Sequence, residues 1–252
     1  MSVGYATAAA IPISEKWGNK EACLCIHGFC SVPGLYRPLA PDIRAAGYDL
    51  YAPLLSGHGT QPVDMLAVTA EQWQEDSRRA LEPLLSAYEK VHLIGTSMGG
   101  ALATYLAGCY GDTGKLGKLL LLVPGYRLYN QGFYQLDFRR CGRMAIPLNK
   151  ALAIPPELAE SAFIYDFVYV RCIGELLRLG QLCQSYIPQV KSPVWLLYAL
   201  RDQEVDPACC REAAESFPHL VQAQAYEQSG HQLLLDCQRE EVYAKIREFL
   251  RA

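Results

Sequence analysis

Short apolar runs alternate with longer amphipathic stretches along this chain. The apolar runs have the length and the Val, Ile and Leu content of buried strands, and they predict strands at 22–26, 48–52, 91–94, 119–123, 194–200 and 221–226. Apolar positions at helical spacing predict helices at 70–88, from Ser97 onward, at 207–217 and at 238–250. Strands and helices that alternate in this way predict an α/β fold, in which helices cover both faces of a mostly parallel sheet.

Three prolines interrupt otherwise helical patterns. Pro38 and Pro41 lie in the stretch before Gly47, and Pro83 lies inside 70–88. Because proline removes a backbone donor and its ring clashes with the preceding turn, we expect a kink or a new helix start at these positions.

The alternation of strands and helices lapses between Gly125 and Pro188. We therefore interpret 125–188 as an insertion after the strand that ends near Val123, and 1–124 together with 189–252 as the core. The insertion is rich in aromatic residues, namely Tyr126, Tyr129, Phe133, Tyr134, Phe138, Phe163, Tyr165, Phe167, Tyr169 and Tyr186. These side chains either form a small core of their own or cover an apolar pocket. We favour a cap, because ligands bind near strand ends in open α/β sheets.

Composition and charge indicate the size and the class of the protein. The 252 residues, 51% of them hydrophobic, suffice for one large domain. With 23 Lys and Arg residues against 26 Asp and Glu residues, the net charge of −3 gives no reason to expect nucleic acid or an anionic membrane as a partner. No apolar run is long enough to cross a bilayer, and the first residues lack the basic flank of a secretory signal. We expect a soluble cytoplasmic protein.

The 10 cysteines are scattered along the chain and form no C-x-x-C pair. A chain of this length needs no disulfide framework, so we expect reduced thiols that serve as small core residues. Their spacing fits no metal site, and the chemistry predicted below requires no cofactor.

The strongest chemical signal is the sequence G-T-S-M-G at 95–99, which follows a predicted strand and opens a predicted helix. This is the context of the nucleophile elbow, in which a strained turn exposes a serine above the sheet. Gly95 and Gly99 stand where the close approach of backbone leaves no room for a side chain. The pattern predicts Ser97 as the nucleophile of an acyl-transfer reaction, with the N-terminal end of the helix directed at the site.

A serine nucleophile needs a base, and the chain offers five histidines. His92 lies inside a predicted strand, and His219 lies in an apparent surface connection. His27 and His58 lie in short loops bounded by glycine. His231 follows the last predicted strand and precedes the last helix, so it can reach the nucleophile across the strand ends. Because an imidazole accepts and returns protons near neutrality, we predict His231 as the general base.

The imidazole in turn needs an acidic partner that holds its tautomer. Asp202 follows the strand predicted at 194–200 and is our first candidate. Asp206 is the alternative, although its place directly before Pro207 is typical of a helix N-cap. Asp236 lies close to the general base in the chain, and we interpret it as structural.

Acyl transfer also needs hydrogen-bond donors for the tetrahedral oxyanion. The backbone amide of Met98, directly after the nucleophile, is one candidate. The second is expected in the loop after the strand at 22–26, where Phe29 supplies its amide. In this loop Gly28 permits a close approach, and His27 is expected to hold the loop by a hydrogen bond.

These motifs together resemble the α/β-hydrolase superfamily over essentially the whole chain, and more narrowly its bacterial carboxylesterase and monoacylglycerol lipase group. The order of nucleophile, acid and histidine along the chain is also that of this superfamily. The matching segments are H-G-F at 27–29, L-S-G-H-G at 55–59, T-A-E-Q-W-Q-E-D at 69–76, G-T-S-M-G-G at 95–100, R-D-Q-E-V-D-P at 201–207 and Y-E-Q-S-G-H at 226–231.

The resemblance implies an α/β-hydrolase fold with 125–188 as its cap, and His58 as a structural loop residue. It also implies short- to medium-chain esters or monoacylglycerols as substrates. Ser97 separates the chain from haloalkane dehalogenases and epoxide hydrolases, which carry aspartate there, and the lack of an H-G-G-P-G loop separates it from proline iminopeptidases. Thr96 and Met98 stand where this group often has leucines, which leaves the chain-length preference open.

Other activities stay open at this point. The elbow specifies acyl chemistry but not the leaving group, so a thioester, an amide or a carbon–carbon bond is an alternative substrate. A catalytically idle hydrolase fold that binds a ligand is a further alternative. Arg139, Arg140 and Arg143 either select an acidic substrate or form a solvated face of the cap, and we favour the solvated face.

Overall fold

The centre of the molecule is a seven-stranded sheet with the strand order β1-β3-β2-β4-β5-β8-β9. The computed structural model describes residues 7–148, 158 and 165–252. The strands are β1 (Ile13–Glu15), β2 (Glu21–Ile26), β3 (Tyr48–Ala52), β4 (Lys90–Thr96), β5 (Leu116–Leu122), β8 (Val194–Ala199) and β9 (Leu220–Tyr226). Neighbouring strands pair in parallel, except that β1 runs antiparallel to β3. The predicted α/β fold with a mostly parallel sheet is confirmed.

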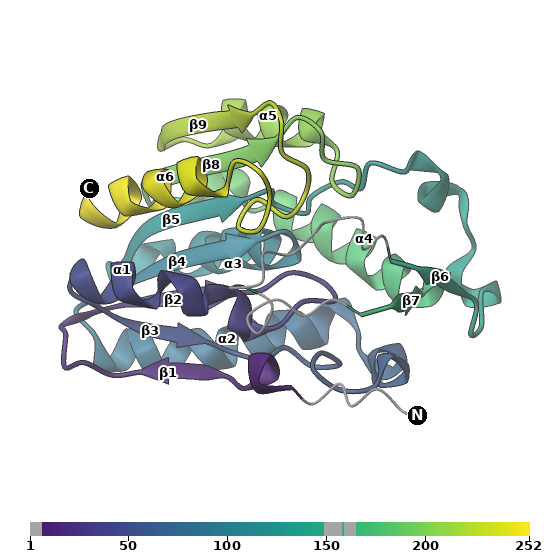
Figure 1. Cartoon of the computed structure of the whole chain (residues 1–252), viewed down its shortest axis with the longest axis horizontal. Coiled ribbons are helices and arrows are strands. Elements are labelled where there is room, and N and C mark those ends of the chain that lie inside the picture. The colour runs from purple at the N-terminus through teal and green to yellow at the C-terminus, as the bar shows by residue number, and fades with distance from the viewer. Residues whose placement is uncertain (1–6, 149–157, 159–164) are drawn as a thin grey trace.

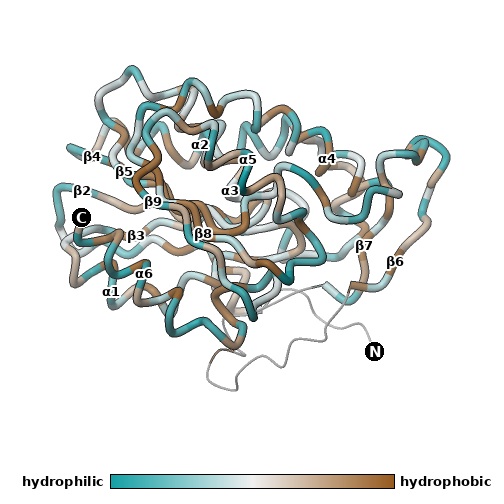
Figure 2. Tube along the Cα trace, turned by 90° about the horizontal axis from the view of Figure 1, so that it is seen from above, coloured by the Kyte–Doolittle hydropathy of each residue, from teal (hydrophilic) through white to brown (hydrophobic). Residues whose placement is uncertain are grey.

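Helices cover both faces of this sheet (Figure 1, Figure 2). α1 (Ala40–Ala45) and α6 (Arg239–Arg251) lie on one face, and α2 (Ala70–Ala87), α3 (Met98–Tyr110) and α5 (Pro207–Ser216) lie on the other. Figure 2 shows the hydrophobic central strands enclosed between the two layers. Their nearly complete burial removes apolar surface from water, which is the main favourable term in folding. None of the described helices is long and apolar enough to cross a membrane.

The prolines have different effects in different helices. Pro38 lies inside the 3₁₀ helix η2, and a new helix, α1, begins two residues later, as predicted. Pro83 lies inside α2, which continues through it without the predicted restart. Because Pro83 is exposed, water can satisfy the carbonyl that the proline leaves without a donor. Short 3₁₀ helices occur at η1 (Ala8–Ala10), η2 (Pro33–Leu39), η3 (Pro62–Ala67), η4 (Gly111–Thr113), η5 (Gln131–Gln135), η6 (Phe138–Arg140) and η8 (Ile187–Gln189).

The segment 125–188 contains a small sheet and a long helix. β6 (Ala145–Pro147) pairs with β7 (Phe167–Tyr169) in antiparallel fashion, and both lie beyond the carboxyl ends of the central strands (Figure 1). α4 (Val170–Gln184) follows β7 directly, and its helical pattern was not predicted.

α4 packs against the core helices. Glu175 accepts a hydrogen bond from the amide of Ala70 at the start of α2 (3.0 Å), and Arg178 forms an ion pair with Glu71. The apolar face of α4 joins the same hydrophobic cluster as the central sheet. The C-terminal part of 125–188 is therefore continuous with the core, and Val168 of β7 belongs to the same cluster.

The aromatic side chains of 125–188 serve mainly in packing against the core. Tyr126 and Tyr165 are buried and hydrogen-bonded through their hydroxyl groups. Among the described aromatic residues of this segment, Phe133 alone lines the cavity that Ser97 and His231 also line, and Phe163 lies outside the described residues. The aromatic content therefore reflects the packing of this segment on the core more than a pocket wall.

The 10 cysteines are free thiols. Most of them are buried, as expected of small core residues, namely Cys23, Cys25, Cys30, Cys172, Cys183, Cys209 and Cys210. Burial raises the pKa of Cys172 to about 11, so this thiol stays protonated near neutrality.

Candidate active site

The predicted site residues come from the carboxyl ends of four parallel strands. His27 follows β2 and Ser97 follows β4, while Asp202 follows β8 and His231 follows β9. The carboxyl ends of parallel strands share one edge of the sheet, and this edge faces β6 and β7 (Figure 1). Ligands bind at this edge in open α/β sheets.

Ser97 occupies a strained turn between β4 and α3. Its φ of 54° and ψ of −121° lie outside the regions that residues with a side chain ordinarily adopt. A side chain at Gly95 would collide with the carbonyl of Gly99, and a side chain at Gly99 would collide with the carbonyl of Ile26. The turn therefore requires glycine at both positions, and the surrounding backbone holds the serine in its strained conformation.

The loop after β2 lies directly beside this serine. A Cβ atom at Gly28 would approach the Cβ of Ser97 to 3.1 Å, and glycine avoids this crowding. The buried ring of His27 donates from Nδ1 to the carbonyl of Gly28 (2.9 Å) and accepts at Nε2 from the amide of Leu55 (3.2 Å). Burial lowers the pKa of His27 to about 3, so the ring stays neutral, as these two bonds require. His27 thus holds the loop, as predicted.

Two backbone amides beside the serine are available to a ligand. Met98 is the first residue of α3, and the first amides of a helix have no acceptor within the helix. Within the described residues, the amide of Phe29 donates to no protein acceptor. The Phe29 ring packs edge-on against Trp73, with centroids 5.8 Å apart, and this contact helps to place the loop.

His231 and Asp202 form a buried pair. Nδ1 of His231 lies 2.7 Å from Oδ2 of Asp202. The other carboxylate oxygen, Oδ1, accepts from the amides of Glu204 (2.8 Å) and Val205 (2.9 Å). Both oxygens of the carboxylate therefore accept hydrogen bonds. In a neutral His231 ring, this carboxylate favours the tautomer with its hydrogen on Nδ1, so Nε2 carries no hydrogen and can accept one.

The two other candidate acids have different partners. Oδ1 of Asp206 accepts from the amide of Ala208 at the start of α5, and Oδ2 pairs with Nε of Arg127 (2.9 Å). Oδ2 of Asp236 accepts from the amide of Gly230 (2.6 Å). The helix-capping role predicted for Asp206 is confirmed, and Asp236 stabilises the loop that carries the histidine.

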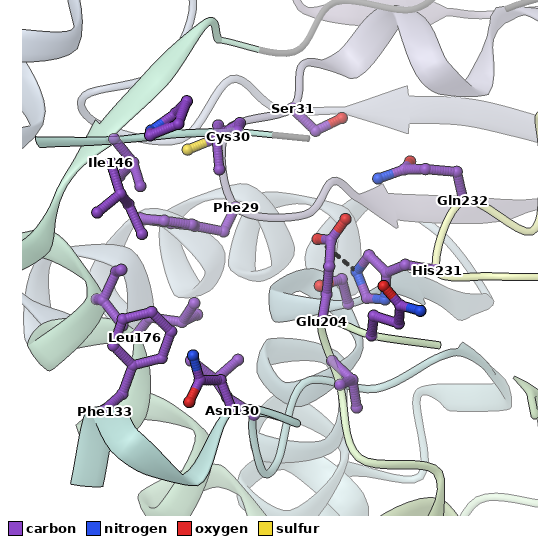
Figure 3. Close-up of a pocket in the computed structure, with 18 residues that line it drawn as sticks. Phe29, Cys30, Ser31, Asn130, Phe133, Ile146, Leu176, Glu204, His231 and Gln232 are labelled. Carbon is purple, nitrogen blue, oxygen red and sulfur yellow. Dashed lines mark ion pairs between the residues drawn. The ribbon is translucent and has the colours of Figure 1, made fainter. Parts of the chain in front are cut away.

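Ser97 and His231 line one cavity of about 270 Å³. Within the described residues, no hydrogen bond joins their side chains, and such bonds often form only when a substrate is bound. Nε2 of His231 instead lies 3.6 Å from Oε2 of Glu204 (Figure 3). Burial by itself lowers the pKa of His231, but the carboxylates of Asp202 and Glu204 outweigh it and raise the pKa to about 9.

The cavity is apolar on one side and polar on the other. The apolar side is formed by residues of 125–188, among them Phe133, Ile146, Leu148, Val168, Ile173 and Leu176. The polar side is formed by Gln203, Glu204 and Gln232 beside the histidine. Figure 3 shows Phe133, Ile146 and Leu176 on one side of the cavity, with Asn130 close to Phe133, and Glu204 and Gln232 on the other side.

The remaining histidines lie outside the cavity lining. Nε2 of His92 lies 2.8 Å from the carboxylate of Glu21, so His92 is a paired strand residue. His58 is buried, and its Nδ1 donates to the carbonyl of Ser56 (3.1 Å), which suits a structural loop residue. His219 is exposed.

The three arginines singled out within 125–188 also lie outside the cavity lining. Arg139, Arg140 and Arg143 are exposed, and Arg140 pairs with Asp137 at 3.3 Å. They form a solvated face, which was the favoured interpretation.

Sequence reasoning did not single out Glu204 or the aliphatic lining residues. Glu204 lies two residues after the predicted acid, and this proximity was the available signal. Ile146 and Leu176 reach the cavity only because β6 pairs with β7 and α4 packs on the core, and no local pattern marks them.

Comparison with known proteins gives the family. Residues 18–238 match the family described as serine aminopeptidase, S33 (Hydrolase_4). The chain belongs to this family. The matched range includes the strained serine turn, the loop after β2 and the Asp202–His231 pair.

This S33-family chain is similar to esterases and lipases. It is 25% identical to a carboxylesterase of Bacillus subtilis (strain 168) over 248 residues, which are 95% of each chain. It is 37% identical to a thermostable monoacylglycerol lipase of Bacillus sp. (strain H-257) over 89 residues, 35% of this chain and 36% of that one. A solved structure from work on the metagenome-derived lipolytic enzymes LipS and LipT superposes with a TM-score of 0.85 at 25% identity, covering 98% of this chain and 99% of that one. The resemblance to α/β-hydrolases is confirmed.

Proposed function

We propose that this chain hydrolyses carboxylic esters of short- to medium-chain acids through an acyl-enzyme on Ser97. The observation that carries the proposal is the buried Asp202–His231 pair, which lies at the same cavity as a serine in a strained turn. The coarser assignment, a carboxylic ester hydrolase with an α/β-hydrolase fold, rests on the family and agrees with the names of the carboxylesterase and monoacylglycerol lipase relatives.

The first half of the proposed reaction acylates the serine. His231 accepts the proton of Ser97 at Nε2, and the serine oxygen attacks the ester carbonyl. Asp202 stabilises the imidazolium that forms. The amides of Phe29 and Met98 donate hydrogen bonds to the tetrahedral oxyanion. The imidazolium then gives its proton to the alcohol oxygen, and the alcohol leaves.

The second half of the reaction frees the acid. His231 accepts a proton from water, the water oxygen attacks the acyl carbon, and the same two amides stabilise the second oxyanion. His231 then returns the proton to the oxygen of Ser97, which leaves the acid product. These steps require no metal and no organic cofactor.

Within 125–188 we place the cap of this enzyme. Phe133, Ile146 and Leu176 give the cavity a hydrocarbon surface on the side away from the histidine. An acyl chain gains free energy when it leaves water for such a surface. The acyl chain of the substrate is therefore placed under the cap.

A series of p-nitrophenyl esters from acetate to palmitate tests this function. We expect Ser97-dependent hydrolysis with kcat/KM highest for short or medium acyl chains, because a cavity of about 270 Å³ encloses only part of a long chain. A folded protein that hydrolyses no ester of the series would contradict the proposal. A fluorophosphonate probe then separates the alternatives: labelling of Ser97 would favour a thioester, amide or carbon–carbon substrate, and no labelling would favour an idle ligand-binding fold.

Activity is expected to require alkaline conditions. The pKa of His231 is raised to about 9, and only its neutral form can accept the serine proton. Below that pH, kcat/KM should therefore fall about tenfold for each pH unit, since the neutral fraction falls by that factor. Titration of kcat/KM between about pH 6 and about pH 10 measures the midpoint. A midpoint near the ordinary histidine pKa of about 6.5 would contradict the effect assigned to the two carboxylates.

A further inference from the structure

Glu204 occupies a position that the proposed reaction does not use. It lies in the loop after β8, two residues beyond Asp202. Its amide donates to Oδ1 of Asp202 at 2.8 Å, so the acid that holds His231 also holds the backbone of Glu204. Its carboxylate lies 3.6 Å from Nε2 of His231 (Figure 3). The imidazole therefore stands between two carboxylates, one at each ring nitrogen.

The carboxylate of Glu204 is accessible to a molecule bound in the cavity. The side chain is 56% exposed and belongs to the cavity lining. In the part of the chain that the structure describes, its one ion-pair partner is His231, and no Lys or Arg lies within ion-pair distance. The neighbouring polar lining residues, Gln203 and Gln232, are uncharged. A neutral His231 therefore leaves a negative charge at this end of the cavity without a fixed counter-charge.

The reaction brings the alcohol part of the ester to this end of the cavity. The leaving alcohol receives its proton from Nε2 of His231, so its oxygen must lie within hydrogen-bond reach of that atom. In the proposed reaction the acyl chain extends the other way, toward the apolar side formed by Phe133, Ile146 and Leu176. Substituents on the alcohol therefore lie within a few atoms of the Glu204 carboxylate.

We propose that Glu204 determines the specificity for the alcohol part of the ester, and that the enzyme prefers alcohols that carry a positive charge. This inference rests on the proposed ester hydrolysis at Ser97. A cation placed against Glu204 gains Coulomb energy, while an anionic alcohol part is repelled. Alcohols with hydroxyl groups can donate hydrogen bonds to the same carboxylate, at a smaller gain than a full charge.

A pair of isosteric esters tests the preference. Butyrylcholine and 3,3-dimethylbutyl butyrate have the same acyl group and nearly the same shape, and they differ in the positive charge on the alcohol. The ratio of their kcat/KM values, measured by pH-stat titration at low ionic strength, is expected to favour the choline ester. Glu204→Gln should lower this ratio up to about fivefold, the upper end of the range for one solvent-exposed ion pair. The ratio cancels any change in the basicity of His231, because both esters use the same base.

A matched variant controls for net charge. Glu215 is an exposed residue of α5 outside the cavity lining, so Glu215→Gln removes the same charge from elsewhere on the protein. We expect it to leave the ratio unchanged. Raising the salt concentration should reduce the wild-type preference, because exposed charges are screened. Equal Tm values for the two variants and the wild type would exclude a folding defect.

The outcomes separate this inference from the proposed function. Ser97-dependent hydrolysis of both esters with a ratio that Glu204→Gln does not change would overturn the role of Glu204 and leave the ester hydrolase intact. A wild-type preference for the neutral ester would overturn it as well. If neither ester, nor any p-nitrophenyl ester, is hydrolysed in a Ser97-dependent way, the proposed function fails and this inference fails with it.

Discussion

Replacement of Ser97 by alanine is expected to lower kcat for p-nitrophenyl butyrate by about 10⁴- to 10⁶-fold. Alanine lacks the oxygen that forms the acyl-enzyme, and His231 then has no hydroxyl to deprotonate. The fold should be unaffected, because alanine carries the same Cβ in the same strained conformation, with φ at 54°. Steady-state kinetics together with a thermal melt measure both effects.

A second serine of the cavity provides the control. Ser31 also lines the cavity, so Ser31→Ala removes a hydroxyl from the same space without touching the predicted nucleophile. We expect Ser31→Ala to keep kcat within a few-fold of the wild type. Near wild-type turnover by Ser97→Ala would mean that another group performs the chemistry.

The Asp202→Asn variant is expected to lower kcat about 10⁴-fold. Oδ1 of Asp202 accepts two backbone amides, so the asparagine oxygen should take that place and direct its NH₂ group at Nδ1 of His231. Nδ1 would then have to accept a hydrogen bond, and the ring hydrogen would move to Nε2, where it blocks proton transfer from the serine. The loss should appear in kcat at saturating ester, with a folded protein.

Asp206→Asn is the matched variant for this experiment. The residue lies in the same loop, but it caps α5 and pairs with Arg127. Asparagine is also a good N-cap, so we expect a small loss of stability and a kcat near that of the wild type. The opposite result, a large kcat loss in Asp206→Asn and a small one in Asp202→Asn, would reverse the assignment of the acid.

Much of the fold was predictable because its signals are local. The central strands read as apolar runs since both faces of a parallel sheet are buried, and the structure places strands at all six predicted positions. β1 was missed because three residues carry too short a pattern, with Ile13 as its buried member. α4 was missed because it lies in 125–188, where the alternation of predicted strands and helices lapses. The new helix start predicted as one outcome at Pro83 does not occur, since α2 continues through this position, where the exposed side leaves the free carbonyl accessible to water.

The strained turn at Ser97 could be recognised in the sequence for the same reason. A side chain at Gly95 or Gly99 would clash with atoms of the turn itself or of the adjacent strand end. The need for glycine is therefore visible in a short sequence motif. The position of His231 after the last strand is likewise a matter of order along the chain.

The surroundings of the histidine depended on the tertiary structure. Asp202 and His231 are 29 residues apart in the chain; the sequence ranks Asp202 before Asp206, and the folded loops bring the Asp202 carboxylate to Nδ1. The same folding brings Glu204 to Nε2 and aliphatic side chains of 125–188 to the far side of the cavity. Charge interactions and apolar burial depend on distances between segments remote in sequence, and these distances exist only in the folded chain.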